Sequence, residues 1–284
     1  MVPTRFRLCA TCLFFTIVLQ TPGEAAADIA LRTVVVRNDT APGGGVFLNF
    51  GSPVLNDSGQ IAFAADVASP GTSGVWRESS GVFELLLAKG VTPTQPGGET
   101  IDWISSVLLT GNGDVVARVE LSSFVDGYYF GDGTLVLAIA IEGESAPGTG
   151  TVFDDIGPTL RVSDAGEIAF FTVLALGGSV NVNNAMGIWA GGAGGLALAA
   201  RQGDVAPGSG GAEWFILQGG PGRGQPRLAP DGTLAFAATT LDAPFAAPSG
   251  VWTGTPSSLA PVTFGAEVQY DYAAIASNGT LAFR

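Results

Sequence analysis

Asn56-Asp57-Ser58-Gly59-Gln60-Ile61-Ala62-Phe63 is the stretch that decides the fold of this 284-residue chain, because variants of it return four more times. Each copy places an Asn- or Asp-bearing glycine turn directly before an apolar strand. Asn and Asp tolerate the backbone of a tight turn, and glycine takes positive φ without steric cost. The turn glycines are spaced 47 to 66 residues apart and are Gly59, Gly113, Gly166, Gly232 and Gly279. This period is close to that of propeller blades.

Two further markers keep the same phase. A Gly-aromatic strand follows each of the first four turns, and its aromatic residues are Trp76, Tyr129, Trp189 and Trp252. An acidic residue then precedes an Ala-Pro-Gly turn, with complete copies at Asp39, Glu144 and Asp204 and a degenerate copy at Glu267. Together the markers predict an all-β fold, a β-propeller of four-stranded antiparallel blades with four full repeats plus a partial fifth.

One unit shows how a blade is expected to form. The strands are predicted at Phe153 to Val162, Glu167 to Leu174, around Gly187 to Trp189, and Leu196 to Arg201. Strands such as Ile168 to Phe171 are apolar on both faces, which a sheet with one wet face would not be. We therefore expect each sheet to be sandwiched between its neighbours, with the repeated Trp and Tyr side chains in the packing between blades.

The segment Pro226-Arg227-Leu228-Ala229-Pro230-Asp231-Gly232-Thr233-Leu234-Ala235-Phe236 resembles the hairpin of TolB-type, WD40-like propeller repeats. The whole unit, with its Ala-Pro-Gly turn and Gly-Val-Trp strand, is similar to an uncharacterised repeat of exported bacterial proteins that often end in a sorting or anchoring segment. The resemblance covers roughly residues 29 to 284. It implies a propeller outside the cytoplasmic membrane, in the periplasm, at the cell surface or in the medium, and it brings no catalytic residues.

Residues 1–27 are predicted to be a signal peptide, and residues 28–284 the propeller repeat domain. Arg5 and Arg7 precede an apolar run from Leu8 to Leu19, and Ala25-Ala26-Ala27 supplies small residues for cleavage. Twelve apolar residues are too few to span a bilayer, so no transmembrane span is expected in the mature chain. The last repeat stops after its second strand, which favours a C-terminally incomplete propeller. Alternatively, Ala30 to Arg37 could supply a fourth strand and close an irregular ring, which would favour a monomer.

Composition excludes several kinds of chemistry. The chain has no histidine, and Cys9 and Cys12 both fall in the predicted signal peptide, so Ser-His-Asp or Cys-His catalysis and thiolate or histidine zinc sites are excluded. The single lysine, Lys89, lies in no phosphate-binding loop. A net charge of −13 argues against nucleic acid as a partner.

Carboxylates and amides remain as candidate functional groups. The first strands of the blades are expected to approach the propeller axis, and near their starts lie Asn49, Asp102, Asp154, Asp155, Glu213 and Asp271. If these side chains converge, they form a ring of oxygen ligands suited to Ca²⁺, with Asp102, Asp154 and Asp271 as metal ligands; no other cofactor is expected. The same ring could bind a neutral sugar, with nearby stacking surfaces at Trp103, Trp214, Tyr270 and Tyr272. Solvated strand ends are the plainer interpretation.

The acidic residues of the Ala-Pro-Gly turns form a second set. Asp39, Glu144, Asp204 and Glu267 are expected to accept hydrogen bonds within the turn. A surface cation site is the alternative at these positions.

Three functions agree with these features. The favoured hypothesis is a non-catalytic binding or scaffold module of the cell envelope that recognises a glycan or a protein. The second is a glycoside hydrolase or lyase that uses two of the axial carboxylates. The third is a purely structural surface repeat. Fold analogy alone does not separate them, because one propeller scaffold hosts many functions.

Overall fold

The computed structural model describes residues 32–69, 71–91, 93, 99–217, 225–241, 248–265, 273–276 and 279–283, and every regular element in these ranges is a β-strand. The predicted signal peptide and the turn residue Asn278 lie outside them. No helix in the described ranges is long and apolar enough to cross a membrane.

The strands form a succession of antiparallel sheets that follow one another along the chain. Sheet 1 contains β1 (Val46–Phe50), β2 (Val54–Leu55), β3 (Ile61–Ala68), β4 (Thr72–Ser79) and β5 (Val82–Ala88). Sheet 2 contains β6 (Ile101–Leu109), β7 (Val115–Leu121), β8 (Asp126–Gly131) and β9 (Val136–Ile141). Sheet 3 contains β10 (Ser145–Ala146), β11 (Thr151–Val162), β12 (Ile168–Leu174), β13 (Met186–Gly192) and β14 (Gly195–Arg201).

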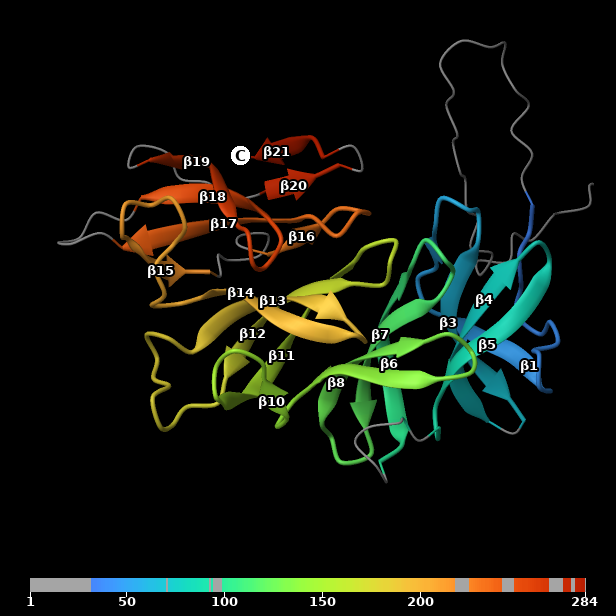
Figure 1. Ribbon diagram of the computed structural model, residues 1–284. Coiled ribbons are helices and arrows are strands. Elements are labelled where there is room, and N and C mark those ends of the chain that lie inside the picture. The colour runs from blue at the N-terminus through green and yellow to red at the C-terminus, as the bar shows by residue number, and fades with distance from the viewer. Residues whose placement is uncertain are drawn as a thin grey trace, which may run out of the picture.

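Sheet 4 contains β15 (Glu213–Ile216), β16 (Arg227–Leu228), β17 (Leu234–Leu241), β18 (Ser249–Gly254) and β19 (Ala260–Gly265). A last pair consists of β20 (Ala273–Ile275) and β21 (Leu281–Phe283). Figure 1 shows the sheets side by side along a curve, from sheet 1 in blue to the red C-terminal pair. The chain therefore has a β-propeller-like all-β fold, and the unit from β11 to β14 lies where the sequence predicts its four strands.

The repeated markers have clear structural reasons. Gly59, Gly113, Gly166 and Gly232 all have positive φ at the turn between the first and second long strands of a sheet. At the Gly-aromatic strand the reason is steric. A Cβ on Gly187 would lie 2.4 Å from the indole of Trp189, because the ring two residues later folds back over the glycine. Only glycine leaves room for the ring.

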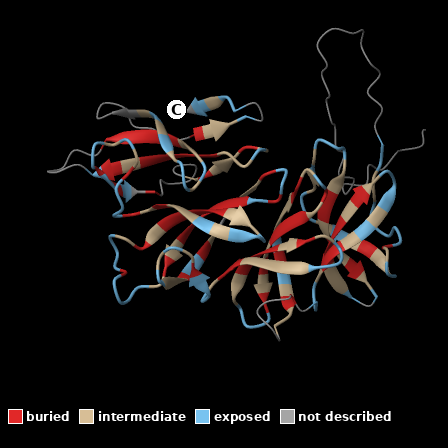
Figure 2. Ribbon diagram, viewed as in Figure 1, coloured by how far each residue is buried: buried red, intermediate tan, exposed pale blue. Residues whose placement is uncertain are grey.

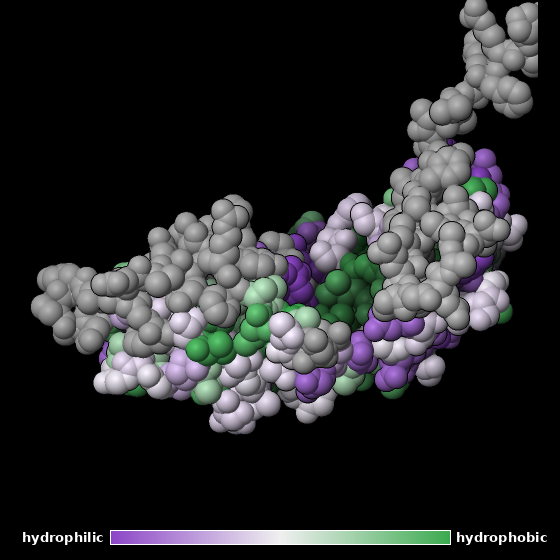
Figure 3. Space-filling view, turned by 90° about the horizontal axis from the view of Figure 1, so that it is seen from above, coloured by the Kyte–Doolittle hydropathy of each residue, from purple (hydrophilic) through white to green (hydrophobic). Residues whose placement is uncertain are grey.

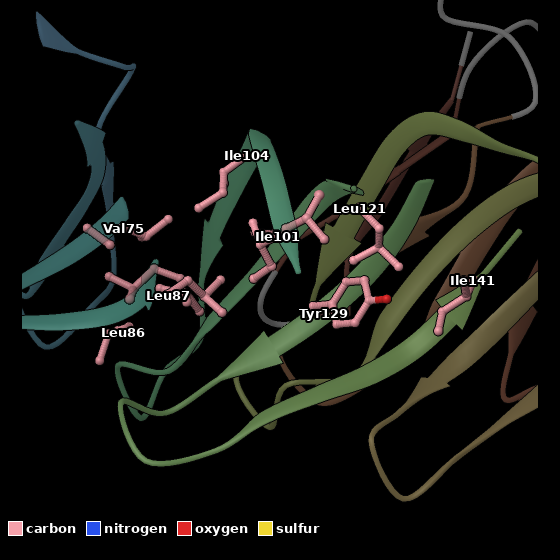
Figure 4. Close-up of a cluster of buried hydrophobic side chains, with 13 residues drawn as sticks. Val75, Leu86, Leu87, Ile101, Ile104, Leu121, Tyr129 and Ile141 are labelled. Atoms are coloured by element: carbon pink, nitrogen blue, oxygen red, sulfur yellow. The ribbon is translucent and has the colours of Figure 1, made fainter. Parts of the chain in front are cut away.

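Side chains between consecutive sheets form the core, which lies on both faces of the inner sheets (Figure 2). The cluster between sheets 1 and 2 includes Val75 and Leu87 from one sheet and Ile101, Leu121 and Tyr129 from the other (Figure 4). Similar clusters lie between sheets 2 and 3 and between sheets 3 and 4. The predicted sandwiching is confirmed for Tyr129, Trp189 and Trp252, which are buried between sheets. Trp76 is also buried, but in the cluster on the outer face of sheet 1, so its predicted place between blades is wrong.

The glycine turns also join one sheet to the next. The Asn56 side-chain amide donates to the carbonyl of Thr110 at 2.9 Å. Backbone hydrogen bonds join the next turns in the same way. Gly111 N donates to Asp164 O, and Asp164 N donates to Pro230 O, both at 3.1 Å. These bonds hold the ends of the inner strands together, so the repeat carries an inter-sheet contact as well as a hairpin.

Residues 32–37 do not form the expected strand. No described strand lies beside them to complete a ladder; instead Val35 packs on the aromatic cluster of sheet 1, which includes Phe47, Phe63 and Trp76. Arg32 forms two hydrogen bonds with the buried carboxylate of Glu78, at 3.0 and 2.8 Å. The segment therefore covers the outer face of sheet 1. In a view from above, apolar surface lies in a hollow of the molecule (Figure 3).

Candidate functional site

The proposed axial residues occupy different positions in their strands. Each first strand carries a bulge after its buried residue, and Asp102 and Asp154 are the extra residues of two of these bulges. Asn49 and Asp155 lie one residue later and pair with the second strand. Glu213 lies earlier, opposite Leu241. The sequence spacing did not reveal this offset, because a bulge shifts the register without leaving a turn signal.

Their contacts within the described ranges are local. Lys89 Nζ lies 2.9 Å from Asp102 Oδ1, and Asn49 Nδ2 donates to Asp66 Oδ2 at 3.0 Å. Asp271 lies outside the described residues. The described part contains no group of three or more carboxylates placed to hold a metal ion. The Ca²⁺ site at Asp102, Asp154 and Asp271 stays a prediction.

The acidic residues of the Ala-Pro-Gly turns act mainly through their backbone. The carbonyls of Asp39, Glu144 and Asp204 accept hydrogen bonds at 2.8 to 3.0 Å from the buried residue that starts the next sheet, such as Phe153. Asp39 also accepts a bond from Val36 N through its side chain, at 2.9 Å. Glu267 lies outside the described residues. These contacts favour the turn interpretation over a cation site.

One member of the axial set takes part in a denser cluster between sheets 2 and 3. Glu142 follows β9, and its Oε1 accepts a hydrogen bond from Ile156 N at 2.9 Å, one residue beyond Asp155. Its Oε2 accepts a longer bond of 3.3 Å from Asp126 N at the start of β8. Asp126 Oδ2 in turn accepts a 2.7 Å bond from Arg118. We call Arg118, Asp126, Glu142 and Asp155 the Glu142 junction.

The carboxyl groups of the junction have different surroundings. Burial raises the pKa of Glu142, and although two backbone N–H groups oppose the rise, the charges of Asp126 and Asp155 add to it. Asp155 itself is exposed. A half-buried carboxyl with a raised pKa thus lies beside the exposed side chain of Asp155. Such a pair can divide the roles of acid and base.

The scaffold around the junction is well fixed. Tyr128 is buried and donates its hydroxyl to the carbonyl of Gly157, two residues after Asp155. Burial raises the pKa of Tyr128, so it stays protonated. The hydroxyl of the buried Thr172 donates to the Asp155 carbonyl. The backbone that carries Asp155 is therefore held on both sides.

Sequence reasoning found Asp155 but missed Arg118, Asp126 and Glu142. One signal was present: Glu142 lies two residues before Glu144, at a position that carries Lys89 and Gln202 in the neighbouring repeats. The structure explains the variation, since Gln202 also reaches across to the next sheet, where its Nε2 donates to Phe215 O at 3.1 Å. Glu142 fills the same bridging position with an ionisable group.

The aromatic residues expected near the axial set have different surroundings. Trp214 is buried in the core between sheets 3 and 4, so it offers no stacking surface. Trp103 is 62% exposed and pairs across the sheet with Glu120, which pairs with Asp126. Tyr270 and Tyr272 lie outside the described residues. Trp103 is thus in the same row of sheet 2 as one carboxylate of the junction.

Comparison with known proteins gives one family match. The profile of a family of unknown function, DUF7453, matches residues 113–253, from the turn before β7 to β18. This span is just under half of the chain and includes all four residues of the Glu142 junction. No curated protein sequence matches. The TolB-type and WD40-like assignment gains no support from these comparisons.

The similarities to solved structures are weak, as three of the matches show. The α-L-arabinofuranosidase Arb93A of Fusarium graminearum, in complex with an iminosugar inhibitor, matches with 11% identity and a TM-score of 0.36 over 82% of this chain and 73% of that one. The GH93 α-L-arabinofuranosidase of the same organism, with arabinobiose, has 11% identity and a TM-score of 0.30 over 81% and 67%. A mitotic checkpoint complex chain has 12% identity and a TM-score of 0.24 over 95% of each.

These matches correct the functional prediction from sequence. Two of the three are glycoside hydrolases, which contradicts the favoured hypothesis of a non-catalytic module and the expectation that the chain is not an enzyme. The TM-scores are too low to transfer a substrate or a residue role to this chain, so any activity must be argued from its own residues.

Proposed function

We propose that this protein hydrolyses glycosidic bonds at the Glu142 junction. The observation that carries the proposal is the pairing of Glu142, whose pKa is raised by burial, with the exposed Asp155 beside it. Glycoside hydrolysis needs two carboxyl groups with different protonation states and neither histidine nor cysteine. This requirement agrees with the composition of the chain.

The roles follow from the surroundings of each group. Protonated Glu142 would donate its proton to the glycosidic oxygen as the bond to the anomeric carbon breaks. Asp155, which is open to solvent, would either attack the anomeric carbon or take a proton from the water that does. Arg118 holds Asp126 at 2.7 Å, so the charge of Asp126 next to Glu142 is partly balanced. Hydrolysis then yields two sugars with free hydroxyl groups.

The first experiment is to incubate the purified full chain with 4-nitrophenyl glycosides of common pyranoses and furanoses and to measure nitrophenol release. Replacing the acid or its partner, in Glu142→Gln or Asp155→Asn, should lower kcat about 10²-fold or more. Glu144→Gln, two residues away, and Asp57→Asn, at the far ends of the strands, serve as matched controls and should keep wild-type rates.

Two results would overturn the proposal. One is the absence of hydrolysis of every glycoside by the wild-type chain. The other is a rate that falls equally in Glu142→Gln and in Glu144→Gln. If hydrolysis is seen, the configuration of the released sugar, followed by NMR, shows whether Asp155 attacks the anomeric carbon or activates water.

Architecture and location are part of the same proposal. Each of sheets 1 to 4 would form one four-stranded blade, and β20 with β21 would begin a fifth. Cleavage after Ala27 would release the protein outside the cytoplasmic membrane, where polymeric glycans are accessible. N-terminal sequencing of protein recovered from the medium or periplasm should give Asp28 as the first residue; retention of Met1 would reject export by this signal.

A further inference from the structure

Exposed apolar side chains are distributed unevenly over the two ends of the strands. We call the end that carries the β7–β8 turn and the connections between sheets the connection face, and the opposite end the hairpin face. Large apolar residues exposed at the connection face are Val36, Val91, Trp103, Phe124, Leu176, Val182, Val205, Phe215 and Leu241. Those at the hairpin face are Leu55, Val82 and Leu135, and Val262 lies along β19, toward the same face. The Glu142 junction also lies at the connection face.

Two aromatic side chains stand out on this face because neither contributes to the core. Trp103 is 62% exposed on β6, and Phe124 is 81% exposed in the turn between β7 and β8. That turn is tied to the start of β6, since Ser122 N donates to Thr100 O at 2.9 Å and the Ser122 hydroxyl donates to Glu99 at 2.7 Å. The two rings are thus carried by adjoining elements of sheet 2.

The backbone at Phe124 does not favour an aromatic residue. Its φ is 64°, in the left-handed region that glycine or asparagine adopts more easily. A strained conformation at an exposed bulky residue does not stabilise the fold. Something other than stability must account for the ring.

We infer that Trp103 and Phe124 form an aromatic platform that binds a neutral oligosaccharide and leads it to the Glu142 junction. The inference rests on the proposed function and adds the substrate class and a binding subsite. The apolar C–H face of a pyranose or furanose ring stacks on an aromatic face. Glu120 and Asp126 continue the row of Trp103 across sheet 2, and their carboxylates can accept hydrogen bonds from sugar hydroxyls.

Charge selects the kind of glycan. The chain has a net charge of −13, and Glu120 lies directly opposite Trp103 in the sheet. Lys89 pairs with Asp102 and Arg118 pairs with Asp126, so these two cations are already neutralised by neighbouring carboxylates. An acidic polysaccharide, a nucleic acid or an anionic membrane would be repelled. A neutral chain of several sugars has both the apolar faces and the hydroxyl donors that the platform can use.

The fluorescence of Trp103 can be used to measure binding. The chain has five tryptophans, and the other four, Trp76, Trp189, Trp214 and Trp252, are at most 3% exposed. Acrylamide quenching of the native protein therefore reports mainly Trp103. The probes are cellohexaose, xylohexaose, mannohexaose and arabinohexaose, with oligogalacturonate as the acidic counterpart, all added to the Glu142→Gln variant so that no probe is consumed.

The expected result is that at least one neutral hexasaccharide protects Trp103 from acrylamide while oligogalacturonate does not. Calorimetry should then show binding weakened about tenfold or more by Trp103→Ala and by Phe124→Gly. Phe124→Gly removes the unfavourable φ, so its midpoint of thermal unfolding should not fall and lost binding cannot be due to unfolding. Val82→Ala and Leu135→Ala, on the hairpin face, should bind as the parent does.

The inference is overturned if no neutral hexasaccharide protects Trp103, or if Trp103→Ala binds as tightly as the parent. Protection by a cationic amphipathic peptide and by no sugar would also overturn it and assign the platform to a protein partner. Its failure differs from that of the proposed function. Hydrolysis without protection rejects the platform alone, whereas protection in Glu142→Gln without hydrolysis by the wild type rejects the enzyme alone.

Discussion

The indole Nε1 of Trp189 donates a 3.1 Å hydrogen bond to the carbonyl of Pro147, 42 residues earlier in the chain. Sheet 4 repeats the pairing, since Trp252 Nε1 donates to Pro207 O at 2.9 Å. Two sequence markers of one repeat thus meet in space: the Ala-Pro-Gly turn supplies the acceptor that the buried tryptophan of its own sheet requires. In sheet 1 the buried indole of Trp76 has no hydrogen-bond partner among the described residues.

This difference predicts the cost of losing each indole. Trp189→Phe should lower the free energy of unfolding by about 1–3 kcal/mol more than Trp76→Phe, because only the first leaves a buried acceptor unpaired. Both replacements remove a similar volume from a core position, so Trp76→Phe is the control. Urea denaturation of the two variants measures the difference. Equal losses would show that the Trp189 bond contributes nothing.

The close contact between the glycine turns of sheets 2 and 3 predicts that a side chain at Gly111 destabilises the protein. A Cβ on Gly111 would lie 2.8 Å from Asp164 Cβ in the next sheet, so Gly111→Ala must push the two turns apart and weaken the bond from Gly111 N to Asp164 O. We expect a loss of about 1–3 kcal/mol. Gly194 has open space around its Cα and no positive φ, which makes Gly194→Ala the matched control. Thermal unfolding of both variants tests the prediction, and similar midpoints would reject it.

Stability should pass through a maximum at mildly acidic pH. Burial raises the pKa values of Asp114, Glu142 and Asp204, so their contribution is fully present below the unfolded-state pKa and is lost as pH rises through the folded-state values. The hydrogen-bonded Arg32 lowers the pKa of Glu78, whose contribution is lost as pH falls. The free energy of unfolding should therefore rise as the pH falls from neutral toward the unfolded-state pKa values of these three groups, and fall again as Glu78 takes up its proton.

Urea denaturation at half-unit steps from pH 3.5 to pH 8 measures this curve. Glu142→Gln should flatten its neutral side, and Glu78→Gln its acidic side. A curve that rises steadily up to pH 8 would contradict the raised pKa values.

The raised pKa of Glu142 also predicts how activity depends on pH. If Glu142 is the proton donor, kcat/KM should fall on the alkaline side as Glu142 loses its proton, at a pH above the ordinary glutamate value of 4.5. An added carboxylate would rescue Asp155→Asn if Asp155 attacks the anomeric carbon, and azide would then yield a glycosyl azide. An alkaline limb that is unchanged in Glu142→Gln would assign the proton donor elsewhere.

The sequence predicted much of the fold because its signals are local. Glycine at a positive-φ turn and glycine under an aromatic ring are requirements of a few neighbouring residues, so both recur as readable motifs. Strands such as β11 and β12 lie within a residue or two of their predicted bounds. Residues 32–37 differ, because a strand also needs a partner, and sequence alone does not show where that partner lies.

The candidate site was only partly predictable for the same reason. Asp155 is visible near a strand start, whereas Asp126 begins β8 and Glu142 follows β9, and both come near Asp155 only where sheet 2 packs on sheet 3. Trp103 and Trp214 show the limit most clearly. Both lie early in a first strand, yet the bulge leaves one exposed and the other buried.

The sequence by itself determined the repeat, the all-β class and the absence of histidine chemistry, since these depend on residue type and on short-range backbone sterics. Only the tertiary structure decided which carboxyl has a raised pKa and which aromatic ring remains exposed. The hydrogen bonds and charges that act on Glu142 come from β8 in sheet 2 and β11 in sheet 3, and no spacing along one strand encodes a distance between sheets.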